Sequence, residues 1–455
     1  MNRTLCDFAA LCGGRYQGED QAYSGVATDT RTLRAGEIYL ALRGPRFDGN
    51  DFVADAAVAG AVAAIVDRPV TTSLPVIEVA DGQAALTQAA SGWRSRFGGV
   101  VVGVAGSNGK TTVKEMTSSI LAQRGACLAT RGNLNNHIGV PLTLLRLSDE
   151  HRSAVIEIGA NNPGEVAALV KIARPDVGLI TNAGAEHLEG FGDLDGVARA
   201  EGEMVAGLGE GNVAILNADD PYATLWRSMT RARVVTFGVD NPADFSAGDV
   251  REELNDAGFR TSFTLHAPQG QRDVRLNVGG RHNLRNALAA AAAGVAAGAS
   301  LDEVVSGLAA MQPVAGRLQP GRTMQGARLL DDSYNANPSS MRAGIDVLTK
   351  MPGKAWLVMG DMGELGEHAR SSHVEIGQYA RERGVQRLFA TGALSMLAVE
   401  AFGSGASWHP DTQSLARALN EALSADVTLL VKGSRSNRLE RVVASVTGER
   451  AKEMH

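Results

Sequence analysis

Residues 100–112 read VVVGVAGSNGKTT, and this stretch decides the fold around it. An apolar, β-branched run meets a glycine-rich turn, and Lys110, two threonines and a helical pattern follow. This order predicts a strand, a phosphate-binding loop and a helix, whose backbone N–H groups and positive end face an anion. The standard loop has a glycine five positions before Gly109, where this chain has Val104, with Gly106 two positions later. We expect the chain to bind a nucleoside triphosphate, with Lys110 on its outer phosphates.

The residues after this loop alternate between strand-like and helix-like patterns. Further strands are predicted over 154–158, 177–181 and 213–216, and helices over 113–125, after Asn162-Pro163 and over 195–208. Such alternation predicts a mostly parallel sheet with helices on both faces. Ligands of such sheets bind beyond the carboxyl ends of the strands, where the phosphate loop also lies.

The 455 residues are too many for one core and suggest roughly three domains. The first segment has apolar runs at 38–42, 62–66 and 76–79, with a helical pattern at 52–64, and a helix at 83–97 leads into the loop. After a break at Gln312-Pro313, strands recur at 328–330, 355–359, 387–390 and 427–431, without a G-x-G-x-x-G fingerprint. We therefore predict an α/β protein of three domains: a small mixed α/β domain (1–82), a central domain with a mostly parallel sheet (83–312) and a Rossmann-like α/β domain (313–455).

Composition excludes some classes of partner. The net charge of −6 provides no basic field for nucleic acid or anionic membranes. The longest nearly apolar run, 287–299, is too short to span a bilayer, and the first residues lack a signal-peptide pattern. Three cysteines without metal-ligand spacing indicate reduced thiols, so we expect a cytoplasmic protein.

Four polar residues, near predicted strand ends, on the phosphate loop or on a helix, are candidates for chemistry. Glu157 ends a strand beside the phosphate loop, where a carboxylate can ligate Mg²⁺, and Thr111 would offer its hydroxyl to the same ion. His187 follows another strand end in a glycine-rich loop. Glu201 is the one charge on the apolar face of the helix at 195–208, so it is either a metal ligand or the partner of an arginine.

Two other polar segments are ambiguous from the residues alone. Asp331 and Asp332 end a strand before an Asn- and Pro-containing turn, which could be only a tight loop. The segment 282–286 opens an alanine-rich helix and reads as a cap with a solvated first turn.

Taken together, the motifs resemble the Mur ligase family, which forms amide bonds with ATP in peptidoglycan synthesis. The matching segments cover essentially the whole chain in order: TDTR at 28–31, ALRGPRFDGNDF at 41–52, AGSNGKTT at 105–112, GNLNNHIGVP at 132–141, EIGANNPGE at 157–165, HNLRNALAA at 282–290, GRL at 316–318, DDSYNANPSSM at 331–341, GDMGELG at 360–366 and KGSRS at 432–436. YNANP favours the branch that adds D-alanyl-D-alanine to a UDP-N-acetylmuramoyl-tripeptide through an acyl phosphate.

The resemblance implies roles for named residues. ATP would be bound by the loop, by an adenine contact and by two residues of the third domain: Gly106, Ser107, Asn108, Gly109, Lys110, Thr111, Thr112, Asn286, Arg317 and Asp331. The UDP-linked substrate and the dipeptide would be bound by Thr30, Arg31, Asn135, Asn136, His137, Asp361, Lys432, Ser434 and Arg435. Two Mg²⁺ ions would be held by Thr111, Glu157, His187 and Glu201, and Lys110, Glu157 and His187 would be catalytic.

The chain departs from the family pattern at two places. The family usually has a carbamylated lysine in an A-K-G-E segment, whereas residues 200–203 read AEGE, so Glu201 is expected to supply the carboxylate directly. AGAEH at 183–187 puts Glu186 beside His187, with no role that we can assign. Other readings are a different amino-acid-adding Mur ligase, a folylpolyglutamate synthetase-like ligase, and a non-enzymatic nucleotide-binding descendant. Closure of the domains on binding and a monomeric state are also expected.

Overall fold

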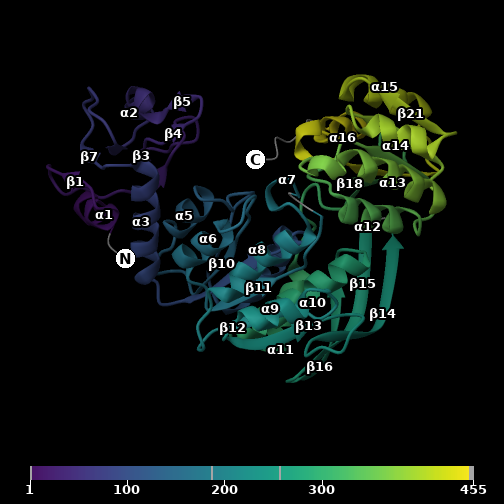
Figure 1. The fold of residues 1–455 in the computed structure, drawn as a ribbon, viewed down its shortest axis with the longest axis horizontal. Coiled ribbons are helices and arrows are strands. Elements are labelled where there is room, and N and C mark those ends of the chain that lie inside the picture. The colour runs from purple at the N-terminus through teal and green to yellow at the C-terminus, as the bar shows by residue number, and fades with distance from the viewer. Residues whose placement is uncertain (1–2, 186–187, 256–257, 450–455) are drawn as a thin grey trace.

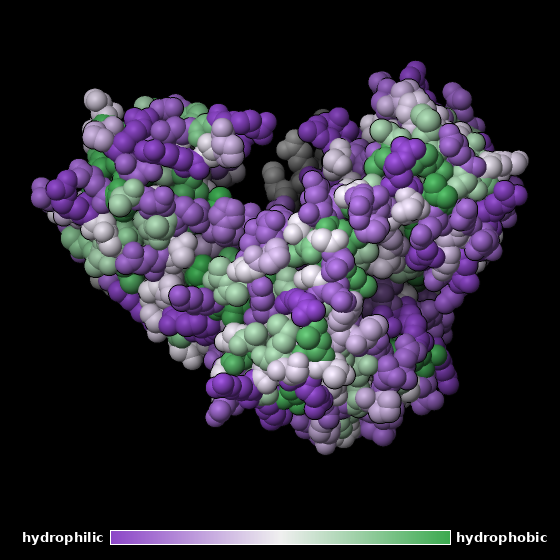
Figure 2. All heavy atoms as spheres, viewed as in Figure 1, coloured by the Kyte–Doolittle hydropathy of each residue, from purple (hydrophilic) through white to green (hydrophobic). Residues whose placement is uncertain are grey.

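The computed structural model describes residues 3–185, 188–255 and 258–449. They form three lobes arranged as a V, with the central lobe at its base and the N-terminal and C-terminal lobes as its arms (Figure 1). The space-filling view shows a notch between the two arms and a largely hydrophilic visible face (Figure 2). Within these described stretches, no helix combines the length and the hydropathy that a membrane span requires.

The N-terminal lobe is built on a five-stranded sheet of order β1-β7-β6-β3-β2, in which β1 alone is antiparallel to its neighbour. Its elements are α1 (Leu5–Cys12), β1 (Arg15–Tyr16), β2 (Gly25–Ala27), β3 (Glu37–Leu40), β4 (Arg43–Gly44), β5 (Phe47–Asp48), α2 (Val53–Val58), β6 (Ala63–Val66) and β7 (Val76–Glu78). The helix predicted over 52–64 is shorter, because the chain turns at Gly60, with φ of 93°, and then enters β6.

The central sheet is parallel throughout, with the order β13-β12-β11-β8-β10-β9. Its strands are β8 (Val100–Ala105), β9 (Cys127–Ala129), β10 (Ser153–Glu157), β11 (Val177–Ile180), β12 (Val213–Asn217) and β13 (Arg233–Phe237). The four strands predicted here agree to within one residue at each end. Because all six run the same way, the residues that follow β8, β10 and β11 meet at one edge.

Helices cover both faces of this sheet, as predicted. Along β10, Ala154 and Ile156 enter one hydrophobic core, and Val155 enters the other. The first face packs against α3 (Gly82–Ser95), α5 (Gly139–Leu144), α6 (Glu165–Ala173), α8 (Leu194–Ala206) and α9 (Ala223–Met229). The second packs against α4 (Lys110–Leu121), α10 (Arg281–Ala296) and α11 (Leu301–Ala310). The helix predicted after Pro163 begins only at Glu165, since Gly164 before it has a φ of 84°.

A three-stranded antiparallel sheet between residues 246 and 276 was not predicted. It consists of β14 (Ser246–Asn255), β15 (Gly258–Ala267) and β16 (Gly270–Leu276). Phe263 and Leu265 of β15 alternate into the second core of the central lobe. The ribbon extends toward the C-terminal lobe (Figure 1), and Phe259 packs against the core of that lobe.

The C-terminal lobe has a six-stranded sheet of order β17-β18-β22-β19-β20-β21, parallel except for β17. Its strands are β17 (Gln319–Arg322), β18 (Arg328–Asp332), β19 (Lys354–Met359), β20 (Arg387–Thr391), β21 (Ala406–His409) and β22 (Val427–Lys432). Its helices are α12 (Pro338–Leu348), α13 (Ala369–Glu382), α14 (Ser395–Phe402), α15 (Thr412–Ala422) and α16 (Glu440–Thr447), which leave a separate core on each face. All four strands predicted in this region are present.

Candidate functional site

The phosphate loop joins β8 to α4 and depends on two glycines. Gly106 has φ of 121°, and a Cβ there would lie 2.1 Å from Thr181 Oγ1. Gly109 has φ of 86°, and a Cβ there would lie 2.4 Å from Asn286 Oδ1. Both positions therefore exclude a side chain. Val104 is buried inside β8, so Gly106 supplies the freedom that the standard loop takes from its first glycine.

Side chains around the loop hold its backbone open. Asn182, which follows β11, accepts from the Asn108 N–H at 3.0 Å and donates to the Asn108 carbonyl at 2.8 Å. Lys110 lies at the first position of α4, and its Nζ donates to the carbonyls of Gly106 (2.5 Å) and Ser107 (3.0 Å). The Lys110 ammonium and the N-terminus of α4 therefore both adjoin the loop. The positive charge of the one and the free N–H groups of the other favour a bound phosphate.

Glu157 is the last residue of β10 and is paired in register with Val104 of β8. Its Oε1 accepts from Asn135 Nδ2 at 2.9 Å and from the Thr111 hydroxyl at 3.4 Å. Its Oε2 is buried and accepts no hydrogen bond from the described residues. Lys114 Nζ lies 4.0 Å from this oxygen, which is beyond hydrogen-bond distance, and a divalent cation in contact with the oxygen would offset the cost of its burial. The donor set of Glu157 and Thr111 therefore fits Mg²⁺.

Glu201 contacts the phosphate loop from α8. Val197, Met204 and Val205 on the same helix face are buried, as predicted, and Glu201 is half-buried. One of its carboxylate oxygens accepts from the Gly106 N–H at 2.6 Å. The sequence left a choice between a metal and an arginine, and the structure adds a backbone amide of the phosphate loop as a partner. Glu186 and His187 lie outside the described residues. Within those residues, no cluster of three or more His, Cys, Asp or Glu side chains is placed to hold a metal.

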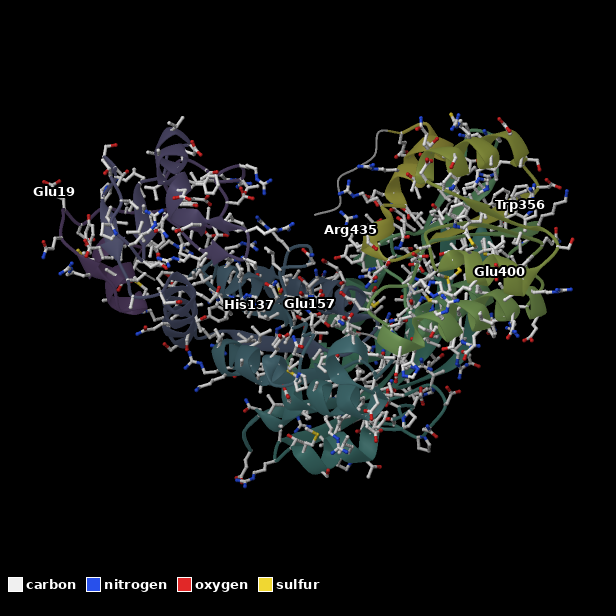
Figure 3. All side chains as sticks on the ribbon, turned by 45° about the horizontal axis from the view of Figure 1, so that its top comes forward. Glu19, His137, Glu157, Trp356, Glu400 and Arg435 are labelled. Atoms are coloured by element: carbon white, nitrogen blue, oxygen red, sulfur yellow. The ribbon has the colours of Figure 1, made fainter. Side chains whose placement is uncertain are left out.

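The stretch between β9 and α5 carries three predicted substrate contacts. Asn136 Oδ1 accepts from the N–H groups of Ile138 and Gly139, which orders the first turn of α5. His137 and Glu157 both lie in the central lobe, and Arg435 projects from the C-terminal lobe at the opposite side of the gap (Figure 3). Asn135, Asn136 and His137 therefore border the same space as the phosphate loop.

The C-terminal lobe reaches the loop through Asn337 and Ser339, at the start of α12. Asn337 Nδ2 donates to Asn108 Oδ1 at 2.8 Å, and Asn108 Nδ2 donates to Ser339 Oγ at 3.1 Å. Arg317 lies over the ring of Tyr334, with 4.2 Å between its guanidinium carbon and the ring centroid. Residues far apart in the sequence thus close one site.

Two neighbouring cavities collect most of the predicted residues. A cavity of about 580 Å³ is lined by Ser107, Asn108, Gly109, Lys110, Thr111, Asn135, Asn136, His137, Glu157, Arg317, Ser434 and Arg435, among others. A second, of about 300 Å³, is lined by Asn108, Gly109, Thr112, Asn286, Arg317 and Lys432, among others.

Charged groups of the second cavity are shielded from water. Lys432 Nζ donates to Asp332 Oδ2 at 2.6 Å, and burial lowers the pKa of this lysine. His282 lines the cavity, and burial lowers its pKa to about 4. Asp331, a predicted nucleotide contact, lines neither cavity; its carboxylate accepts from Ser333, and burial raises its pKa. The second cavity therefore combines an ion pair with a neutral imidazole.

Other predicted residues lie apart from these cavities. Asp361 accepts from the N–H groups of Leu394 and Ser395 and so caps α14. Thr30 and Arg31 lie in the N-terminal lobe, where Arg31 pairs with Asp29 at 2.6 Å. Neither Thr30 nor Arg31 lines the two cavities.

Sequence reasoning missed several residues of the site. Asn182 and Asn337 were not singled out. Asn182 directly follows the strand predicted over 177–181, and Asn337 lies in the turn after the strand predicted over 328–330. Lys114 was also missed, yet it shares a helical face with Thr117 and Leu121, both buried. A lysine at that spacing among buried positions is the signal that could have identified it.

Comparison with known proteins gives consistent matches. Mur ligase domain descriptions match three parts of the chain: "Mur ligase family, catalytic domain" at 22–94, "Mur ligase middle domain" at 104–294, and "Mur ligase, glutamate ligase domain" at 316–435. The UDP-N-acetylmuramoyl-tripeptide–D-alanyl-D-alanine ligase of Escherichia coli K12 is 44% identical over 97% of this chain and 98% of its own.

Two solved structures of MurF are similar over nearly the full length. A crystal structure of MurF from Acinetobacter baumannii superposes with a TM-score of 0.90, at 35% identity, over 99% of both chains. MurF ligase from Thermotoga maritima in complex with ADP superposes with a TM-score of 0.81, at 28% identity, over 93% of this chain and 97% of that one.

Proposed function

This chain belongs to the Mur ligase family, and we propose that it joins D-alanyl-D-alanine to a UDP-N-acetylmuramoyl-tripeptide at the expense of ATP. One observation carries the proposal. The phosphate loop, the carboxylate of Glu157 and the side chains of Asn337 and Arg435 border a single cavity between two lobes. A site of this kind brings a nucleotide, an acceptor and an amine together.

The three lobes divide the substrates among them. The domain of residues 1–82 binds the UDP moiety near Thr30 and Arg31, the domain of 83–312 binds ATP, and the domain of 313–455 receives the dipeptide. Support for the last assignment comes from Ser434 and Arg435, which line the same cavity as Lys110. Asp361 lies behind this wall, where its carbonyl accepts from the Ser434 N–H at 3.0 Å. Asp361 therefore orders the dipeptide wall from behind.

The reaction has two steps. A carboxylate oxygen of the tripeptide attacks the γ-phosphorus of ATP. The bond from this phosphorus to the bridging β-phosphate oxygen breaks, which yields ADP and an acyl phosphate. The amine of D-alanyl-D-alanine then attacks the acyl carbon and loses a proton, and inorganic phosphate departs with the C–O bond electrons. The first step brings anions together, and the positive charge of Lys110 and the N–H groups of the loop offset their repulsion. Arg317 and Asn286 line the second cavity, where the nucleotide base and ribose fit.

Glu157 and Thr111 would hold Mg²⁺, with His187 and Glu201 as ligands of a second ion. When bound, Mg²⁺ neutralises phosphate charge. Glu157 Oε2, which accepts no hydrogen bond from the described residues, supports the first site. The second is supported by the half-buried carboxylate of Glu201 beside the loop.

Glu201 makes a carbamylated lysine unnecessary at this position. Turnover is therefore expected to be independent of added bicarbonate, because a glutamate carries its carboxylate permanently. Steady-state rates measured in degassed and bicarbonate-supplemented buffer check this expectation. A rate that rises with bicarbonate would contradict it.

The same proposal places the enzyme in the cytoplasm, where ATP and nucleotide-linked precursors are available, and as a monomer. Light scattering at assay concentration measures the mass directly.

The decisive experiment is ADP release with UDP-N-acetylmuramoyl-tripeptide, with and without D-alanyl-D-alanine. Sustained release only when both are present, together with product formation, supports the ligase. Lys110→Ala should abolish turnover and keep a near-native thermal melt, because the ammonium lies on the loop surface rather than in a core. Turnover with glutamate or a diamino acid in place of the dipeptide would instead favour another ligase of this architecture.

A further inference from the structure

A buried cation lies behind the phosphate loop, and the reaction steps above do not use it. Lys114 is one helical turn after Lys110 on α4, and only 1% of its surface is exposed. Lysine is almost never fully buried unless it is paired, because taking an ammonium out of water is costly. An apolar side chain of similar length would fill the space without that cost. The charge therefore calls for a functional reason.

The ammonium of Lys114 contacts its neighbour on α4 and lies close to two other segments. It donates to the Thr130 carbonyl at 2.8 Å and pairs with Glu115 Oε1 at 2.7 Å. It also lies 4.0 Å from Glu157 Oε2, the buried oxygen that accepts no hydrogen bond from the described residues. One cation thus joins the nucleotide-binding helix to the residue after β9 and to the carboxylate at the end of β10.

Thr130 has a second contact that makes this arrangement specific. Its Oγ1 accepts from the N–H of Glu157 at 3.0 Å, and its own N–H donates to the Val155 carbonyl at 3.1 Å. Thr130 is also the first residue of the stretch 130–138, which leads to Asn135, Asn136 and His137. A shift of Thr130 would therefore move Glu157 and this stretch together.

We propose that Lys114 is a positioning residue that sets the acceptor substrate against ATP. It fixes the start of the stretch 130–138 and Glu157 relative to α4, so that the carboxylate of the peptide lies in line with the γ-phosphate. The inference deepens the proposed function and rests on it, because it assumes that this stretch binds the acceptor.

The contacts of the loop define what Lys114 should leave unchanged. Residues 106–109 are held by Asn182, Gly184 and Glu201, all outside the contacts of Lys114. The wall at Ser434 and Arg435 belongs to the other lobe. Loss of the cation should therefore spare nucleotide binding measured without Mg²⁺, which does not involve Glu157, and the KM for the dipeptide. It should affect the KM for the UDP-linked acceptor and kcat, because a misplacement of about 1 Å can cost about 100-fold in rate.

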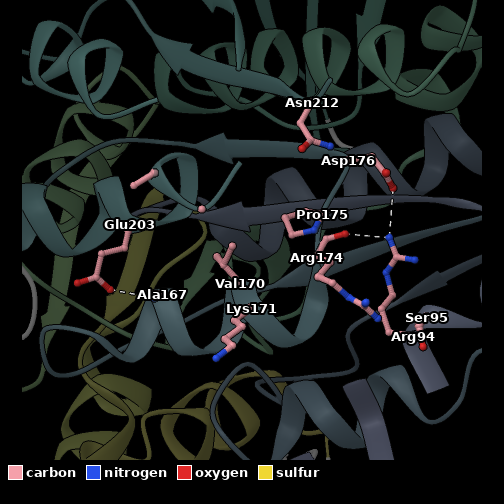
Figure 4. Close-up of a pocket in the computed structure, with 12 residues that line it drawn as sticks. Arg94, Ser95, Ala167, Val170, Lys171, Arg174, Pro175, Asp176, Glu203 and Asn212 are labelled. Carbon is pink, nitrogen blue, oxygen red and sulfur yellow. Dashed lines mark hydrogen bonds and ion pairs between the residues drawn. The ribbon is translucent and has the colours of Figure 1, made fainter. Parts of the chain in front are cut away.

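The test uses Lys114→Met in the full-length protein, with Arg94→Met as the matched control. Arg94 is also a buried cation that donates to a carbonyl, that of Arg174, and it pairs with Asp176 at the amino end of the sheet, away from the site (Figure 4). Each variant is assayed for kcat and the three KM values, and calorimetry gives the Kd for ADP without Mg²⁺ and the Kd for the UDP-linked acceptor.

For Lys114→Met we expect at least a 10-fold loss of kcat and at least a 5-fold rise in the KM and Kd for the acceptor. The Kd for ADP and the KM for the dipeptide should stay within 2-fold. Arg94→Met should lower the melting temperature and keep all three KM values within 2-fold. A merely structural role for Lys114 would give that second pattern.

Thr130→Val keeps the test decisive if Lys114→Met does not fold. It removes the hydroxyl oxygen that accepts from the Glu157 N–H and preserves the side-chain shape. It should lower kcat and raise the KM and Kd for the acceptor while the ADP and dipeptide constants stay unchanged. Thr130→Ser, which keeps the hydroxyl, should have near-wild-type constants. Unchanged acceptor constants in Lys114→Met, or in Thr130→Val when the first variant is unfolded, overturn the inference alone. A wild-type protein without ligase turnover overturns both the inference and the proposed function.

Discussion

The two junctions between lobes are made in different ways. At the first, one hydrophobic core runs without a break from the N-terminal lobe into the central lobe, and includes Phe8, Ile38, Trp93, Val140 and Ile156. At the second, the contacts of Asn108 are polar side-chain hydrogen bonds to Asn337 and Ser339 at the start of α12. The C-terminal lobe has two separate cores, and Phe259 of β15 packs against one of them.

The difference indicates which lobe moves. Apolar burial is large and non-directional, and opening it exposes the whole surface to water. A hydrogen bond between exposed groups contributes only about 0.5–1.5 kcal/mol net, because water replaces the lost partner. We therefore expect the N-terminal and central lobes to move as one unit, and the C-terminal lobe to open for the exchange of substrates.

The largest effect is expected from breaking the apolar junction. Trp93 on α3 is 0% exposed, and its Nε1 donates to the Leu147 carbonyl at 3.0 Å. Trp93→Ala should cost about 3–5 kcal/mol of unfolding free energy, since it opens a cavity and leaves the Leu147 carbonyl with only its hydrogen bond from Arg3. Urea titration should show the N-terminal and central lobes unfolding in one earlier transition. Trp356→Ala, in a core of the C-terminal lobe, is the control and should move a different transition.

A smaller effect is expected from pH at the polar junction. His282 has its pKa lowered to about 4 by burial, whereas an unfolded histidine titrates near 6.5, at about its ordinary value. As the pH falls from about 6.5 to about 4, this histidine becomes protonated in the unfolded chain but stays neutral in the folded one. The unfolding free energy therefore falls by at most about 1.4 kcal/mol per pH unit because of this group. Above that window its contribution is fully present. Urea midpoints of wild type and His282→Asn should diverge between pH 7 and 5, and parallel profiles would contradict the assignment.

The smallest effect is expected from the hydrogen bonds of Asn108. Asn108→Ala removes the contacts to Asn337 and Ser339 and should shift the equilibrium between closed and open forms by about 10-fold, equivalent to about 1.4 kcal/mol. Small-angle scattering with ADP and Mg²⁺ bound measures the larger radius of gyration. Ser339→Ala should give part of the same change. An unchanged scattering curve would mean that other contacts hold the lobe closed.

The sequence predicted the parts of the fold that local patterns determine. Val100–Ala105 and the strands after it are continuous apolar runs, and such runs identify buried parallel strands without tertiary information. The antiparallel ribbon at 246–276 escaped prediction because its strands alternate buried residues such as Phe263 and Leu265 with polar ones, a weaker signal.

The site was predicted in the same uneven way. Lys110, Glu157 and Asn135 lie together because each follows or adjoins a strand end of one parallel sheet. The contacts of Asn108 with Asn337 and of Lys114 with Thr130 depend on how distant segments pack, which no local pattern encodes. The roles of Thr30, Arg31 and Asp361 remain predictions that rest on the family resemblance.

The polar contact between Asn108 and Asn337 has a consequence for inhibitor chemistry. A small molecule that wedges between these two amides needs to replace only a few hydrogen bonds, and its own donors and acceptors can do so. A compound that separated the N-terminal lobe from the central lobe would have to replace the apolar contacts of their shared core. Compounds that bind between Asn108 and Asn337 and hold the C-terminal lobe away from the phosphate loop are therefore the more accessible inhibitor design.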